Sequence, residues 1–270
     1  MGRFGWHRSE GRSGRLQGFR RCAAHERASA VTLQQIIFSQ GFGTRRECLA
    51  LIERGGVCID GAVARLKDQA FATDGLQFRV NGETWTYAER AYLMMNKPAG
   101  YECSQAPKHW PSIYSLLPAP LTTRPTQSSV NGVQAVGRLD QDTTGLLLLS
   151  DDGQFIHRMA SPKHHVPKRY GVTTKHAVDD AAINALLAGV VLNDDPEAVA
   201  AVACERVNET QIYLTLTEGK YHQVKRMLAA VGNRVEALHR AQIGGLPLDA
   251  DLAAGAWRWL TADDLRKIAA

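Results

Sequence analysis

The sequence lacks long apolar runs, and it lacks closely spaced cysteines. A membrane-spanning helix needs roughly 18 or more consecutive apolar residues, and no segment of the 270 residues approaches that length. The five cysteines are scattered along the chain, without the spacing of a zinc site or of a disulfide framework. We therefore expect a cytoplasmic protein with reduced thiols, no membrane role and no structural metal.

The first 30 residues lack an apolar core and are poor in acidic side chains. Residues 1–30 contain seven arginines and only two glutamates, with frequent glycine and serine. A secretory signal needs an apolar stretch that is missing here, whereas an organellar transit peptide has a similar composition. We expect a disordered basic extension, and a transit peptide or an upstream start codon remains an alternative. The whole chain carries a net charge of +5, which suits a polyanionic partner.

Residues 31–82 have the pattern of a small domain of two helices and a twisted sheet. Apolar residues recur at helical spacing from Leu33, and Thr44 with Glu47 fits a capping box at the start of a second helix. An Asp-Gly and an Asn-Gly dipeptide then predict hairpins. Three arginines lie off the buried stripe of the second helix, where they could contact phosphate: Arg45, Arg46 and Arg54.

Polar residues 83–90 predict a linker, and residues 91–270 predict a second, larger domain. Strands and helices alternate there with hairpin turns rather than in regular strand-helix-strand units. That order predicts an α+β domain built on a mostly antiparallel mixed sheet flanked by helices. Residues 103–132 are rich in proline, serine and threonine, so we expect a long surface loop with one helical turn at most.

A polar loop followed by a buried strand is the most distinctive stretch of this larger domain. Residues 137–145 interrupt an apolar pattern, and four consecutive leucines at residues 146–149 restore it. An uninterrupted leucine run predicts a strand that is covered on both faces. Asp140, with Arg138 two residues before it, is therefore held rigidly, as a nucleophile or general base must be. An ordinary acidic loop at the entry to a strand is the alternative that composition leaves open.

Two later segments add basic and aromatic side chains. The basic run at residues 163–170 ends in Tyr170, whose ring could stack on a base or pack in the core. The adjacent histidines in this run have no carboxylate or thiol at ligand spacing, so phosphate contact explains the run better than a metal does. A helix follows Gly219. Its buried stripe leaves three side chains on a neighbouring face: His222, Lys225 and Arg226.

Three blocks of sequence together resemble the pseudouridine synthases that modify ribosomal RNA. They are Arg138-Leu139-Asp140 with Asp142-Thr143-Thr144-Gly145-Leu146, then Lys168-Arg169-Tyr170, then Gly219 through Met227. The resemblance runs from about Thr32 to the C-terminus, and residues 31–82 resemble the RNA-binding domain named after ribosomal small-subunit protein four. Gly137, the lysine at position 225 and the pair His164-His165 favour the small-subunit branch, which acts on 16S rRNA, over the 23S branch.

The resemblance implies a reaction and a role for each matching residue. A uridine would flip out of the RNA stack and be isomerised to pseudouridine. Asp140 would be the catalytic carboxylate, Lys225 its cationic partner and Tyr170 the ring stacked on the target base. Arg138 would fill the gap left by the flipped nucleotide, and Leu238 would form an apolar wall of the pocket. Further RNA contacts are expected from Arg45, Arg46, Arg54, Lys168, His222 and Arg226.

The same resemblance implies no metal, nucleotide or redox cofactor. We expect a monomer whose partner is ribosomal RNA or a ribosomal assembly intermediate. Other functions remain as alternatives: the same reaction on 23S rRNA, and an rRNA-binding assembly factor without activity. A glycoside hydrolase with Asp140 and Asp142 as paired carboxylates is a third. We expect Asp142 instead to brace its loop through backbone amides.

Overall fold

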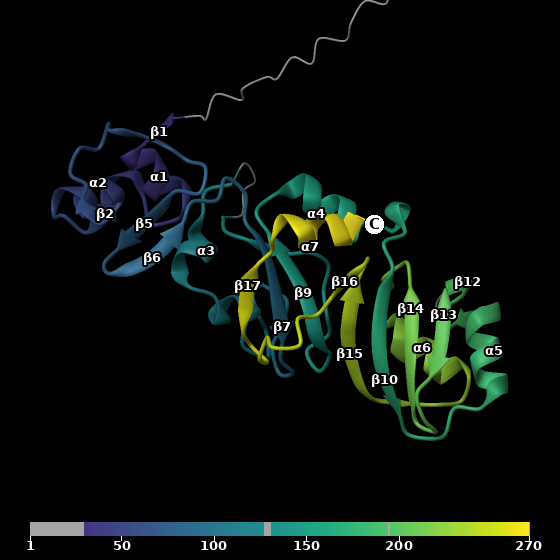
Figure 1. Ribbon diagram of the computed structural model, residues 1–270. Helices are drawn as coiled ribbons and strands as arrows, with labels where there is room; N and C mark the ends of the chain where they lie inside the picture. The colour runs from purple at the N-terminus through teal and green to yellow at the C-terminus, as the bar shows by residue number, and fades with distance from the viewer. Residues whose placement is uncertain (1–29, 127–130, 194, 270) are drawn as a thin grey trace, which may run out of the picture.

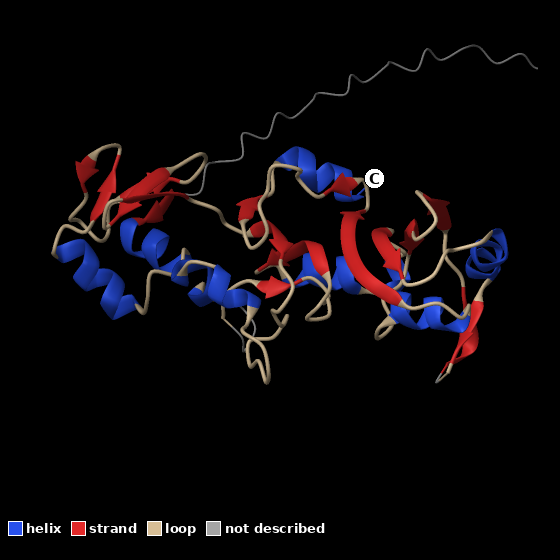
Figure 2. Ribbon diagram, turned by 90° about the horizontal axis from the view of Figure 1, so that it is seen from below, coloured by secondary structure: helices blue, strands red, loops and turns tan. Residues whose placement is uncertain are grey.

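The computed structural model describes residues 30–126, 131–193 and 195–269. The basic extension predicted for residues 1–30 lies outside these ranges except for Ala30, which begins the short strand β1 (Ala30–Thr32). Figures 1 and 2 show an elongated molecule, with a small α/β unit at one end and a large sheet with its helices making up the rest. No helix within the described ranges is long and apolar enough to cross a membrane.

The small unit forms as its sequence predicts. Helix α1 (Leu33–Ser39) and helix α2 (Arg45–Glu53) pack on one core, and the expected capping box joins Thr44 and Glu47 at the start of α2. The remaining strands of the unit are β2 (Val57–Ile59), β3 (Ala62–Val63), β4 (Ala70–Ala72), β5 (Gln77–Val80) and β6 (Glu83–Thr86). Four of them form an antiparallel sheet in the order β3-β2-β5-β6, and β4 pairs with β1.

The linker predicted for residues 83–90 is wrong over its first half. Residues 83–86 are strand β6, which pairs antiparallel with β5. Trp85 is the side chain that packs against the core of the small unit, and its neighbours on β6 are exposed. One partly buried residue among exposed polar ones gives too little alternation to predict a strand.

The large sheet has nine strands and confirms the predicted α+β class. Its main order is β13-β14-β10-β15-β9-β7-β17, and β8 and β16 pair at its margins. Every pairing is antiparallel except that of β15 with β9. The strands are β7 (Tyr92–Lys97), β8 (Gln134–Ala135), β9 (Thr144–Ser150), β10 (Lys168–Thr174), β13 (Ala203–Arg206), β14 (Gln211–Leu216), β15 (Val235–Ile243), β16 (Leu246–Pro247) and β17 (Trp257–Trp259).

The four-leucine run is a central strand with both faces covered, as predicted. All four leucines of β9 are fully buried. Leu147 and Leu149 face a core shared with α5 (Asp180–Ala188) and α6 (Gln223–Ala230). Leu146 and Leu148 face the opposite core, beneath α4 (Gly153–Ala160) and α7 (Ala262–Ala269). The loop before β9 is therefore anchored between two apolar layers.

The sheet is nearly divided between β9 and β15. These two strands share only two residue pairs, and the Arg240 side chain reaches across the divergence to donate from Nε to the Leu146 carbonyl at 2.8 Å. Gly145 stands where the strands meet, with φ at +101°. A Cβ there would lie 2.4 Å from the Arg240 carbonyl oxygen, so only glycine allows the approach.

The segment expected as a surface loop at residues 103–132 contributes to the core. It contains the 3-10 helix η1 (Ile113–Leu116) and helix α3 (Ala119–Thr123), and both Ile113 and Leu121 are buried. The structure also has a 3-10 turn, η2 (Pro162–His164), and a hairpin of β11 (Val190–Leu192) and β12 (Asp195–Val199). The few apolar residues between the prolines have no regular spacing, so their burial could not be predicted from the pattern.

Helix α3 also joins the small unit to the large sheet. Thr123 donates from Oγ1 to the Gly41 carbonyl at 2.6 Å. The next residue, Arg124, is almost fully buried and binds three parts of the chain: Asp151 at 2.7 Å, the Gln40 side chain at 2.8 Å and the Ala88 carbonyl at 2.7 Å. A single guanidinium therefore connects α1, the connecting segment and the end of β9.

Candidate active site

The loop that carries Asp140 is fixed by a buried lysine of the neighbouring strand. Lys97, at the end of β7, is fully buried, and its ammonium donates to the carbonyls of Gln141 at 3.2 Å and Thr143 at 2.9 Å. Burial lowers the pKa of Lys97. Leu139 anchors the other side of the loop in the core. The acid is thus presented by a backbone with little freedom to move.

Asp140 lies in a cluster of four charged or polar groups. Its Oδ2 atom is 3.1 Å from the Lys225 ammonium, and its Oδ1 atom is 3.3 Å from Nε2 of His222. Lys225 is also 2.7 Å from Asp142. The side chains of Asp140 and Lys225 are each 27% exposed, so the pair is accessible from solvent without being fully hydrated.

The contacts that Lys225 makes with the two carboxylates shift its own pKa and that of Asp142. Burial alone would lower the pKa of Lys225, but hydrogen bonds to Asp142 and Asp140 outweigh it and raise the pKa. Burial likewise would raise the pKa of Asp142, and the Lys225 contact reverses this and lowers it. At neutral pH the lysine is therefore a cation, and it favours an ionised carboxylate beside it.

Helix α6 brings the basic groups to the acid. His222 precedes its first turn in a left-handed backbone conformation, with φ at +50°. Val224, Met227 and Leu228 are buried against the large core, which turns Lys225 to the opposite side. The helical spacing of the sequence predicted this division of faces. A non-glycine residue with positive φ is a strained element that often marks a functional site.

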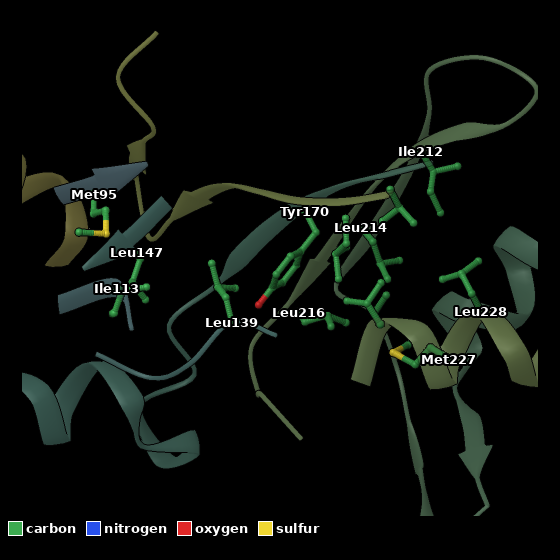
Figure 3. Close-up of a cluster of buried hydrophobic side chains, with 14 of the residues drawn as sticks. Met95, Ile113, Leu139, Leu147, Tyr170, Ile212, Leu214, Leu216, Met227 and Leu228 are labelled. Atoms are coloured by element: carbon green, nitrogen blue, oxygen red, sulfur yellow. The ribbon is translucent and has the colours of Figure 1, made fainter. Parts of the chain in front are cut away.

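A pocket opens beside Asp140 and is lined by Tyr170 and Leu238 as well as by Arg138 and Lys225. Tyr170, on β10, is 8% exposed, and Figure 3 shows its ring between Leu139 and Leu214. The ring therefore belongs both to the core and to the pocket wall. The pocket combines apolar side chains with charged ones, and its lining includes the Glu218 carboxylate and the Lys220 ammonium as well as Asp140 and Lys225. A partly enclosed site of this kind suits a reaction that needs an ionised acid under reduced hydration.

The family model described as RNA pseudouridylate synthase matches residues 91–230, which include Asp140, Tyr170 and Lys225. The chain belongs to this family. A ribosomal small subunit pseudouridine synthase A of Escherichia coli K12 is 39% identical over 237 residues, which cover 85% of this chain and 96% of that protein. An uncharacterized RNA pseudouridine synthase of Bacillus subtilis is 40% identical over 239 residues, covering 87% and 97%.

A solved structure extends the likeness to the fold. The crystal structure of a pseudouridylate synthase is 36% identical, with a TM-score of 0.61, and the match covers 88% of this chain and 99% of that one. The protein is therefore an RNA pseudouridine synthase, an isomerase. This agrees with the family resemblance read from the three sequence blocks.

The residues predicted to bind RNA occupy three different places in the synthase. Arg138 is exposed at the pocket, whereas the ring of His222 contacts the acid itself. Arg226, one turn along α6, donates to the Tyr221 carbonyl at 3.1 Å. The exposed arginines of α2 lie at the far end of the molecule, in the small unit (Figures 1 and 2). They are Arg45 and Arg46, together with Arg54, which caps the C-terminal end of the helix.

Lys168, which was predicted to contact RNA, is partly buried. Its ammonium donates to the Val166 carbonyl at 2.9 Å and lies in a pocket behind Tyr170, near the buried Arg240. Burial, together with the positive charge of Arg240, lowers the pKa of Lys168 to about 8. The sequence predicted phosphate contact for this run, and the alternating burial along β10 places residue 168 on the same face as the buried Tyr170 and Val172.

Asp142 was expected to brace its loop through backbone amides, but its larger contact is with Lys225: both of its oxygens accept from the ammonium, at 2.7 and 2.9 Å, and a backbone amide contributes less. Asp142→Asn would remove one of the two anions on the lysine and leave its contact with Asp140. We expect kcat/KM to fall by about 3- to 30-fold, since a partly exposed ion pair contributes little. Rates of pseudouridine formation measured on one RNA check this. Loss as complete as that of Asp140→Asn would instead indicate paired catalytic carboxylates.

Lys97 is the site residue that sequence reasoning missed. Lys97 is followed by Pro98, and because proline is typical of turns, the sequence predicted only the end of a strand at this point. The usable signal was the lysine itself, because a charge that ends a strand of buried residues must find buried partners. Its partners are loop carbonyls 44 and 46 residues away, which no local pattern reveals.

Proposed function

We propose that this synthase converts one uridine of small-subunit (16S) ribosomal RNA to pseudouridine, with Asp140 as the catalytic carboxylate. The observation that carries the proposal is the contact of Asp140 with Lys225 inside a pocket walled by Tyr170. The choice of RNA is supported by the names of the relatives from Escherichia coli and Haemophilus influenzae, which are ribosomal small subunit pseudouridine synthases.

The reaction breaks the bond between C1′ of the ribose and N1 of uracil, and forms a bond from C1′ to C5. Asp140 either adds to C1′ or removes the C2′ proton, and both routes need it ionised. The detached uracil turns within the pocket and C5 attacks C1′. In the first route this attack displaces the Asp140 carboxylate from C1′, and in the second Asp140 returns the proton to C2′. In both routes C5 then loses its proton and N1 gains one, so the product is an isomer of the uridine. The Lys225 ammonium, 3.1 Å from Oδ2 of Asp140, attracts the negative charge of this carboxylate in the partly enclosed pocket and holds the group in place.

The pocket admits a uridine only after the base leaves the RNA stack, which costs a few kcal/mol. Tyr170 supplies a ring beside the uracil, and Leu238 supplies an apolar wall. Arg138, exposed at the mouth, occupies the gap left in the RNA. The arginines of α2 give the small unit a basic face for RNA phosphates. We propose that the synthase acts as a monomer on this RNA or on an assembly intermediate that contains it.

Mapping pseudouridine in rRNA tests this proposal. A strain that lacks the gene should lose one pseudouridine in 16S rRNA, and the wild-type gene should restore it. Loss of a pseudouridine in 23S rRNA instead would show that the substrate is the RNA of the large subunit. Unchanged rRNA in the deletion strain, together with salt-sensitive rRNA binding by the purified protein, would favour an assembly factor without activity.

A further inference from the structure

Tyr221 is an exposed aromatic side chain at the mouth of the site, and the reaction described above does not use it. It is 74% exposed, more than any other large hydrophobic side chain of the described residues. It lines a groove that also contains Arg138 and Asp140. Water contact over so much of a tyrosine ring is unfavourable, so an exposed aromatic beside a functional groove indicates a ligand surface.

The ring of Tyr221 is already ordered by its neighbours. It stacks on the His222 ring, with centroids 3.8 Å apart and an angle of 20° between the planes. Arg226 holds its backbone through the bond to the Tyr221 carbonyl. One face of the Tyr221 ring therefore packs on the His222 ring, and the high exposure of the tyrosine leaves its opposite face open to a ligand. A ring fixed before binding loses little entropy when a second flat group stacks on it.

The chemistry of the substrate decides which flat group this is. When a uridine flips out, the bases on either side of it lose a stacking partner, and single-stranded RNA bases stack readily on aromatic side chains. Tyr221 lies only one ring away from the acid, because His222 contacts Asp140 at 3.3 Å. With the flipped uridine beside Asp140, the bases next to it along the RNA are the flat groups that the chain connectivity keeps closest to this part of the site.

We propose that Tyr221 is a stacking platform for a nucleobase adjacent to the target uridine. This inference rests on the proposed reaction at Asp140. Stacking recognises any base but favours purines, whose rings are larger, so the platform contributes to the choice among uridines by their neighbours. It also holds the RNA beside the pocket while the uridine is out of the helix.

Substitutions at position 221, combined with altered RNA, test the platform. On an rRNA fragment that contains the mapped uridine, Tyr221→Ala should lower kcat/KM by about 5- to 100-fold, which corresponds to the loss of one base–aromatic stack. Tyr221→Phe keeps the ring and should retain nearly full activity. Val191→Ala removes an exposed apolar side chain from β11, outside the groove, and serves as the matched control.

Abasic substitutions in the RNA separate stacking from a structural role. Removing the base that stacks should weaken wild-type activity and abolish the difference between wild type and Tyr221→Ala. The platform is overturned if the alanine penalty persists with every neighbouring position made abasic, or if phenylalanine is as damaging as alanine. Full activity of Tyr221→Ala would overturn the platform alone. A wild type that makes no pseudouridine would overturn the proposed function, and this inference with it.

Discussion

Asp140→Asn is expected to abolish pseudouridine formation while leaving RNA binding intact. The amide has the shape of the acid, but it cannot add to C1′ or accept a proton, so kcat should fall by at least about 1,000-fold. Lys225 keeps Asp142 as an anionic partner in this variant, which protects the fold around the site. Single-turnover conversion of an rRNA fragment, followed by mass spectrometry of its nucleosides, measures the loss.

The control for Asp140→Asn is its affinity for the same RNA. Binding should change by less than about threefold, because the substituted group is one partly exposed charge among many contacts. Turnover within tenfold of wild type would show that Asp140 is not the catalytic carboxylate. A parallel fall in affinity and in thermal stability would mean instead that the acid is a structural part of its loop.

Arg124→Met should be the most destabilising of the substitutions considered. The arginine and its partner Asp151 are 2% and 5% exposed, so the change leaves a buried carboxylate without its counterion. Breaking a buried ion pair from one side costs about 3 to 5 kcal/mol. Gln40 and the Ala88 carbonyl lose hydrogen bonds at the same time. Urea unfolding followed by far-ultraviolet circular dichroism measures the loss in the free energy of unfolding.

A second variant separates the charge from the packing at Arg124. Arg124→Met combined with Asp151→Asn removes the uncompensated anion and should recover part of the lost stability. The asparagine oxygen can still accept from the Ala91 amide, which Asp151 binds at 2.7 Å. An Arg124→Met protein within 1 kcal/mol of wild type would show that the Arg124 contacts contribute little to the free energy of unfolding.

Local patterns in the sequence were enough to predict many of the helices and strands. The three blocks that resemble the family were enough to predict which residues meet at the site. The capping box at Thr44 and the leucines of β9 follow from spacing and burial, which depend on neighbours in the chain. That Asp140 meets Lys225 followed from the resemblance, since nothing in spacing joins residues 85 positions apart.

The contacts that fix the site could not be predicted in this way. Lys97 binds loop carbonyls, Arg124 binds segments on both sides of a domain boundary, and Asp142 shares the lysine of Asp140. Each is a polar residue whose partner is set by the tertiary fold. Composition predicts that such groups need a partner, and only the fold shows which partner each has.

The two-residue pairing of β9 with β15 has a mechanical consequence for the reaction. Asp140 precedes β9, whereas Tyr170 and Lys225 belong to the other side of that narrow junction, on β10 and on α6. The distance between the Asp140 carboxylate and the Lys225 ammonium therefore depends on how the two parts of the sheet are placed relative to one another, and only two residue pairs join these parts. We therefore expect changes at Gly145 or Arg240 to lower catalysis by shifting the two parts of the sheet relative to one another.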